Sequence, residues 1–94
     1  MSGWLLRLRS RVAGIGQPLG EVYRLTFLVP ESVFRDPEHP GRAYWERRAL
    51  AKAWEGAQPR ELVDVTLTWQ RAGTNAPSGF RAADSVIVVR GVVR

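Results

Sequence analysis

The chain has 94 residues and a formal net charge of +5, with 45% hydrophobic and 24% charged residues. This length fits one domain, and the composition excludes the disordered, collagen-like and membrane-spanning classes. The sequence has no Cys and one His. Thiol catalysis, disulfides and a zinc site made of Cys or several His residues of one chain are therefore excluded. We expect a single domain over residues 1–94.

The positive charge comes almost entirely from arginine, since Lys52 is the one lysine. Two interpretations of this bias stay open. Arginine suits bidentate contact with phosphate or carboxylate groups, whereas a GC-rich genome favours arginine codons without any functional reason. Under either interpretation, the net charge favours anionic partners.

Residues 4–12 alternate between apolar and basic side chains, a period of two that predicts a half-buried strand. The basic side chains are Arg7, Arg9 and Arg11. A Gly- and Pro-rich stretch follows, and alternation resumes over residues 21–29. In this strand Arg24 falls on the face away from the apolar side chains. We expect these two strands to form an antiparallel hairpin.

Residues 30–41 read as a loop, because prolines stand at positions 30, 37 and 40. Asp36 and Pro37 suit the start of a short helical turn. Residues 42–57 show the one convincing helical period, and Gly56 and Pro59 bracket its end. The side chains expected on its inner side are Ala43, Leu50, Ala53, Trp54 and Ala57.

Two further strands are predicted at residues 61–70 and 85–93. In the first, Val63, Val65, Leu67 and Trp69 share one parity, which we expect to face the core. In the second, residues 86–89 are all apolar, so both faces are expected to be covered, either in the centre of a sheet or in a subunit contact.

The predicted fold class is therefore α+β: a four-stranded antiparallel sheet in strand-strand-helix-strand-strand order, with one helix packed on one face. In each of the first three strands, every second side chain is apolar and is expected to pack against the helix. The side chains between them are expected to form an open, solvated face of the sheet.

The first candidate site is an arginine-rich sheet face formed by Arg7, Arg9, Arg11 and Arg24. Several guanidinium groups on a flat surface can bind phosphates or a carboxylate-rich partner. The same residues equally fit a solvated strand face whose charge prevents edge-to-edge aggregation, partly neutralised by Asp64 or Glu61.

The second candidate site is on the predicted helix, where Tyr44 and Trp45 lie off the apolar stripe. The neighbours of Trp45 on the helix surface are Arg48 and Lys52. Exposed aromatic side chains beside arginine are typical of protein-binding hot spots and of stacking platforms for single-stranded nucleic acid. A third possibility is that the proline-rich loop before the helix covers them.

The sequence gives little indication of a catalytic site. His39 lies between Glu38 and Pro40, but no serine stands in a nucleophile-elbow motif, and the carboxylates have no metal-ligand spacing. Gly14 and Gly16 precede a predicted strand rather than a helix, which does not fit a dinucleotide-binding loop. We expect no cofactor, no metal and no enzymatic activity; a pocket near residues 36–39 is what an enzyme hypothesis would require.

The sequence therefore predicts a small, soluble, non-enzymatic interaction or regulatory module with a protein partner. The alternative is a nucleic-acid-binding protein that contacts phosphates through the basic sheet face. We expect a homo-oligomer, most simply a dimer, because the core is small and the last strand is apolar. A cytoplasmic location without membrane contact is expected, since arginines interrupt the N-terminal apolar residues and no apolar run is long enough to span a bilayer.

Overall fold

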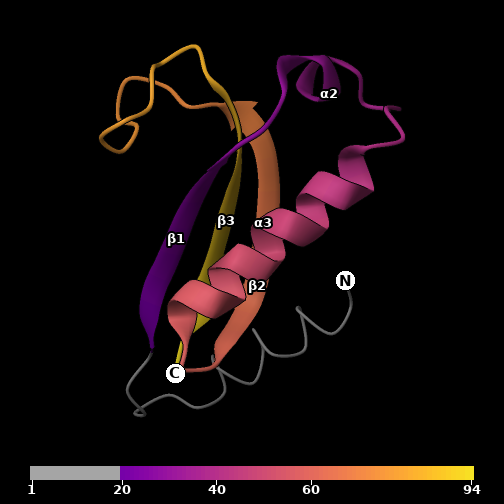
Figure 1. Ribbon diagram of the computed structural model, residues 1–94. Coiled ribbons are helices and arrows are strands. Elements are labelled where there is room, and N and C mark those ends of the chain that lie inside the picture. Colours follow the sequence, from indigo (N-terminus) through magenta and orange to yellow (C-terminus); the bar gives the residue numbers. More distant parts are fainter. Residues whose placement is uncertain (1–19) are drawn as a thin grey trace.

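The computed structural model describes residues 20–94 (Figure 1). The elements, in chain order, are β1 (Glu21–Leu28), α2 (Glu31–Arg35), α3 (Arg42–Ala57), β2 (Leu62–Arg71) and β3 (Ser85–Val93). The strand predicted at residues 4–12, its hairpin with β1, and Arg7, Arg9 and Arg11 lie outside the described residues.

Within residues 20–94 the sheet has three strands in the order β1-β3-β2, and two helices accompany it, so the predicted four-stranded sheet with a single helix is wrong. Both β1 and β2 pair with β3 in antiparallel register, and β1 and β2 therefore run parallel to each other. A connection between parallel strands needs a long crossover, which here includes α3. The crossover leaves a gap between β1 and β2, and β3 fills it.

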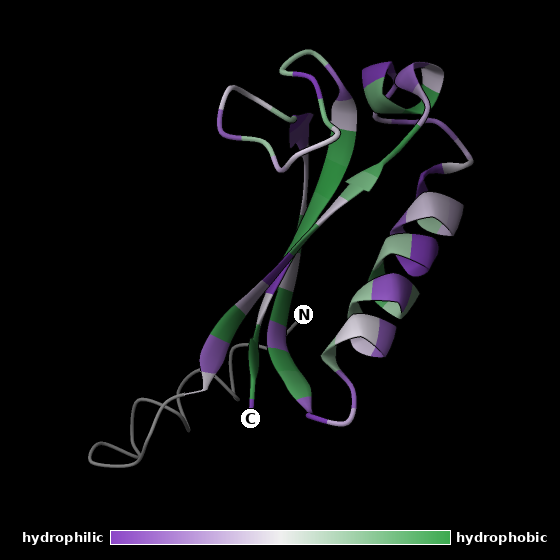
Figure 2. Cartoon of the chain, turned by 60° about the vertical axis from the view of Figure 1, so that its left-hand side comes forward, coloured by the Kyte–Doolittle hydropathy of each residue, from purple (hydrophilic) through white to green (hydrophobic). Residues whose placement is uncertain are grey.

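The central position of β3 explains its continuous apolar sequence. Val86, Ile87, Val88 and Val89 are all buried, which confirms the expectation that both faces of this strand are covered. Figure 2 shows both helices on one side of the sheet, whereas the connection over residues 72–84 projects on the other side. The arrangement of the described residues is thus α+β, with helices segregated to one face of an antiparallel sheet.

The helix α2 was not predicted, and it precedes the turn that was expected at Asp36. Glu31 and Arg35 form an ion pair at 2.7 Å across one turn of α2, with the acidic residue at the N-terminal end and the basic residue at the C-terminal end. Asp36 ends the helix with φ −115° and ψ 99°. A residue before proline avoids the helical region, which explains why α2 stops before Pro37.

Three alanines at four-residue spacing, Ala49, Ala53 and Ala57, form the buried row of α3. Their small side chains let the helix backbone approach the sheet, where Ile87 and Val65 are fully buried. The predicted inner side of the helix was partly wrong, because Trp54 is 46% exposed. Trp54 follows Ala53 directly and so lies about 100° around the helix from the buried row.

A β-bulge interrupts the alternation of β2. The register shifts between Val63 and Thr66, and Asp64 has a positive φ of 55°, a conformation that Asp tolerates better than most residues. As a result Leu62 joins the core cluster together with Val65, Leu67 and Trp69, whereas Val63, which was expected with them, does not.

The bulge also depends on a glycine in β3. A Cβ on Gly91 would lie 2.8 Å from Leu62 Cδ1 and 3.1 Å from the Val63 carbonyl oxygen. A larger residue there requires the Leu62 side chain to shift and the Val63 carbonyl to move by a few tenths of an ångström.

Candidate interaction surface on helix α3

The structure brings together three of the predicted site residues, Tyr44, Trp45 and Arg48, in the N-terminal half of α3. We call them the aromatic–arginine cluster. The Tyr44 and Trp45 rings meet edge to face, with centroids 5.3 Å apart. The Arg48 guanidinium carbon lies 5.8 Å from the Tyr44 centroid and 5.5 Å from the Trp45 centroid. Arg48 Nη1 also donates a hydrogen bond to Tyr44 Oη at 3.2 Å.

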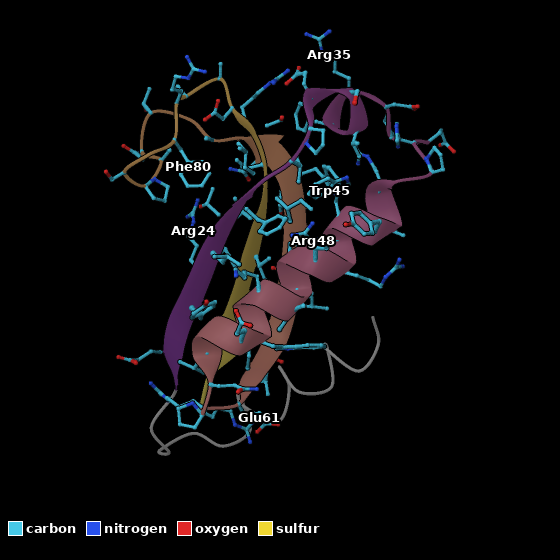
Figure 3. The ribbon with its side chains drawn as sticks, in the orientation of Figure 1. Arg24, Arg35, Trp45, Arg48, Glu61 and Phe80 are labelled. Carbon is cyan, nitrogen blue, oxygen red and sulfur yellow. The ribbon has the colours of Figure 1, made fainter. Side chains whose placement is uncertain are left out.

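Helix geometry produces this cluster, since residues three and four positions apart lie on the same side of a helix. Trp45 is half-buried and packs against Phe27 of β1 with a centroid separation of 6.3 Å. Tyr44 is 48% exposed. The proline-rich loop therefore does not cover the cluster, which joins the edge of the core to the surface (Figure 3).

A shallow groove of about 220 Å³ continues from Arg48 along α3. We call it the α3 groove, and its lining residues are Phe27, Arg48, Ala51, Lys52 and Glu55. Phe27 and Ala51 make an apolar floor between β1 and α3. Lys52 Nζ lies 3.4 Å from a Glu55 carboxylate oxygen, and both side chains are largely exposed.

Positive charge dominates the exposed side of α3. Its exposed charged residues are Arg47, Arg48, Lys52 and Glu55. Glu46, the other carboxylate of the helix, accepts a hydrogen bond from Trp69 Nε1 at 2.8 Å and is half-buried. The surface beside the groove is therefore cationic and aromatic together.

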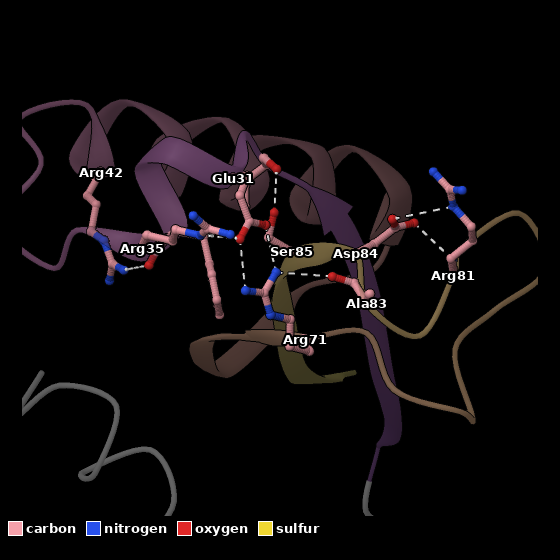
Figure 4. Close-up of polar contacts among 10 residues, drawn as sticks. Glu31, Arg35, Arg42, Arg71, Arg81, Ala83, Asp84 and Ser85 are labelled. Carbon is pink, nitrogen blue, oxygen red and sulfur yellow. Dashed lines mark hydrogen bonds and ion pairs between the residues drawn. The ribbon is translucent and has the colours of Figure 1, made fainter.

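Arg35 and Arg71, by contrast, have structural partners. The Glu31 carboxylate accepts hydrogen bonds from Arg71 at 2.6 and 2.8 Å and from Arg35 at 2.7 Å (Figure 4). Hydrogen bonds from Arg71 first, and from Arg35 second, lower the pKa of Glu31 from 4.5 to about 2. The same contact raises the pKa of Arg71. These groups attach α2 to the end of β2.

Arg24 lies apart from the aromatic–arginine cluster, because it points to the opposite face of the sheet. Its neighbours in sequence on the other parity, Tyr23 and Leu25, pack against the core below α3. Arg24 is directly opposite Arg90 of β3, and both are exposed. We call Arg24 and Arg90 the arginine pair, and within residues 20–94 neither forms an ion pair.

The face that carries the arginine pair differs from the open, solvated face that was expected. Val63 and Val88 are buried on it, while Val22 and Leu28 of β1 are 66% and 57% exposed. The row formed by Arg24, Arg90 and Thr66 is its exposed polar part.

His39 has a local structural role. Its Nδ1 accepts a hydrogen bond from the backbone N–H of Gly41 at 2.9 Å, in the turn that precedes α3. Residues 20–94 contain no group of three or more His, Cys, Asp or Glu side chains positioned to hold a metal ion. Neither helix of this described range has the length and apolar character needed to cross a bilayer.

Phe27 and Arg90 were not predicted as residues of a binding surface. Lys52 was expected beside Arg48 on the helix surface, and the structure places both in the α3 groove. Arg90 follows a run of apolar residues, and only its register with β1 places it opposite Arg24. Comparison with protein-family models, curated proteins and solved structures found no match to this chain.

Proposed function

We propose that the protein is a non-enzymatic interaction module that binds a protein partner through the exposed side of α3. The observation that carries this proposal is the position of Arg48, whose guanidinium group is held against two aromatic rings and contacts no carboxylate of residues 20–94. Tyr, Trp and Arg are the residue types enriched at binding hot spots. An arginine already ordered by ring contacts loses less side-chain entropy when it binds a partner.

A site-specific cross-linking experiment tests this proposal. A photoreactive amino acid replaces exposed Arg47, next to the cluster, and the purified protein is irradiated in an extract of its host cells. We expect a discrete cross-linked product that is lost in the Arg48→Glu variant. Arg81→Glu makes the same charge change in the exposed 72–84 connection and serves as the control. Equal products from all three proteins would show that the assigned surface is wrong.

Nucleic-acid binding is a second candidate function, and the arginine pair favours it. Two exposed guanidinium groups directly opposite each other repel, and a phosphate placed between them would relieve that repulsion. Fluorescence anisotropy with short single- and double-stranded probes at about 50 mM salt tests it. We expect each arginine removed to lower the salt dependence by roughly one phosphate contact. No binding at low salt would end this candidate.

Arg7, Arg9 and Arg11 remain proposed contact residues for either function, although they lie outside the described residues. Arg7→Glu combined with Arg9→Glu would lower cross-linking or probe binding if this segment contributes. Unchanged values for both readouts would remove these arginines from the binding surface.

A further inference from the structure

We infer that the α3 groove binds a short acidic peptide segment of the partner, in which a carboxylate side chain lies beside an apolar side chain. This inference rests on the proposed function and adds the chemistry of the bound segment. It follows from the arrangement of two cations above an apolar floor.

The cations are placed one helical turn apart. Arg48 and Lys52 both line the groove, and Ala51 between them has too small a side chain to fill it. Arg48 donates to Tyr44 Oη but contacts no carboxylate within the described range 20–94, so its other N–H groups can bind one. The contact between Lys52 and Glu55 is 3.4 Å long with side chains 61% and 74% exposed, and exposed pairs of this kind contribute little. A carboxylate of the partner can therefore replace Glu55.

The floor of the groove selects for an apolar neighbour of that carboxylate. Phe27 is partly buried against the core and exposes the rest of its ring towards the groove, beside Ala51. Burial of an aliphatic side chain against this floor removes apolar surface from water and so favours binding. The two kinds of contact together favour a segment that is both acidic and apolar.

The cluster geometry disfavours nucleic acid as the ligand of this groove. Stacking of a base needs a free ring face. Trp45 is half-buried, with Phe27 packed against it and the Arg48 guanidinium carbon 5.5 Å from its centroid, so it offers a base little free ring surface. The apolar floor favours an aliphatic side chain, whereas a phosphate gains nothing from contact with it.

Charge also separates an acidic partner from two internal alternatives. Residues 1–19 contain three arginines and no Asp or Glu, so this segment of the chain does not complement a cationic groove. A second copy of the chain carries the same net charge of +5 and is repelled at long range. An acidic segment of a different protein is the occupant that the charges favour.

Anisotropy with defined peptides tests the inference. The probe is a fluorescein-labelled peptide that alternates Glu and Leu, and the matched peptides alternate Gln and Leu, Glu and Ser, or Lys and Leu. We expect the Glu–Leu peptide to bind at least about tenfold more tightly than each of the others, which is roughly 1.4 kcal/mol. In NMR spectra of the isotope-labelled protein, addition of the Glu–Leu peptide should produce the largest chemical-shift changes at Phe27, Arg48 and Ala51.

Three variants locate the binding. Arg48→Gln and Lys52→Gln should each weaken binding of the Glu–Leu peptide several-fold. Ala51→Met, which fills the groove at little cost in helix propensity, should do the same. Arg81→Gln removes one positive charge elsewhere and should bind like the unchanged protein. Dispersed amide spectra of each variant show that it is folded, so weaker binding reports the groove.

The alternatives give different results. Equal binding of the Gln–Leu peptide, or displacement by a single-stranded oligonucleotide with no effect of Ala51→Met, would overturn the inference. A mass in light scattering that rises with protein concentration and falls when the Glu–Leu peptide is added would assign the groove to a second copy. If Arg47 cross-links a partner in an Arg48-dependent way but the cross-linked segment lacks acidic residues, this inference fails while the proposed function stands.

Discussion

The guanidinium carbon of Arg42, the first residue of α3, lies 4.1 Å from the centroid of the Trp69 ring of β2. The same guanidinium group donates hydrogen bonds to the carbonyl oxygens of Val33 and Phe34, at 3.2 and 2.6 Å, and of Asp36, at 3.1 Å. Carbonyls at a helix C-terminus lack internal partners and attract cations. One side chain therefore joins the end of α2, the start of α3 and the edge strand β2.

Replacement of this side chain should destabilise the fold. Arg42→Lys keeps the charge but loses the planar group that stacks on Trp69 and donates in several directions. We expect a loss of about 1–2 kcal/mol in the free energy of unfolding, measured by urea denaturation. The control is Arg47→Lys on the exposed side of the same helix. Equal stability of the two variants would show that the Arg42 contacts contribute nothing.

The ion pairs of Glu31 should make stability depend on pH in acid. The pKa of Glu31 falls from 4.5 to about 2 on folding, so its contribution is complete above about pH 4.5 and disappears as the pH falls towards 2. Glu31→Gln should therefore be less stable than the unchanged protein at neutral pH, and the difference should shrink between pH 5 and pH 2. Thermal unfolding monitored by circular dichroism across this range measures it; a difference that is constant with pH contradicts the assignment.

The centre of the sheet should be the part most sensitive to truncation. Ile87 of β3 is fully buried and lies opposite Phe27 and Trp69. Ile87→Ala should cost about 2–5 kcal/mol, whereas Ile87→Val, which removes one methylene group, should cost about 0.5–1.5 kcal/mol. Denaturant unfolding of both variants gives the comparison. Similar values for the two would indicate that the site collapses around the smaller residue.

Reversal of one charge in the arginine pair should increase the stability of the fold. Arg24→Glu places a carboxylate directly opposite Arg90, so repulsion becomes attraction and stability should rise by about 0.2–1 kcal/mol. The gain should decrease with added salt, because exposed charges are screened. The double variant with Arg90→Glu restores like charges and should lose the gain. A gain that persists in high salt would point to a cause other than charge.

The individual elements could be predicted because their signals are local. Residues 42–57 and 85–93 are a helix and a strand as predicted, and the other two described strands differ from prediction by about one residue at an end. The strand order could not be predicted in this way. Nothing in the alternation of β1 indicates that it pairs with the last strand, because that pairing depends on how the α3 crossover separates β1 from β2.

The misassigned side chains have equally specific causes. Val63 does not share the face of Val65 as predicted, because Asp64 between them adopts a positive φ. Trp54 lies outside the core because the row of alanines is the side of α3 that packs against the sheet. The association of Tyr44, Trp45 and Arg48 follows from helical spacing and was predicted. The groove beside them needs Phe27 from another element, so it could be found only in the structure.

Homo-oligomerisation stays a prediction, but one of its two arguments has changed. The apolar residues of β3 are already buried within a single chain, so they need no subunit contact. The small core is the argument that is left. Size-exclusion chromatography with light scattering at micromolar concentration measures the assembly directly, and the mass of a single chain would count against it.

The central position of β3 also determines when the sheet can form during synthesis. Both edge strands hydrogen-bond only to β3 among the described strands, and β3 is made after them. A nascent chain whose β3 is still inside the exit tunnel can form its helices but no native strand pair of this sheet. Folding on the ribosome is consequently postponed until β3 leaves the tunnel, and until then the unpaired edges of β1 and β2 are available to chaperones.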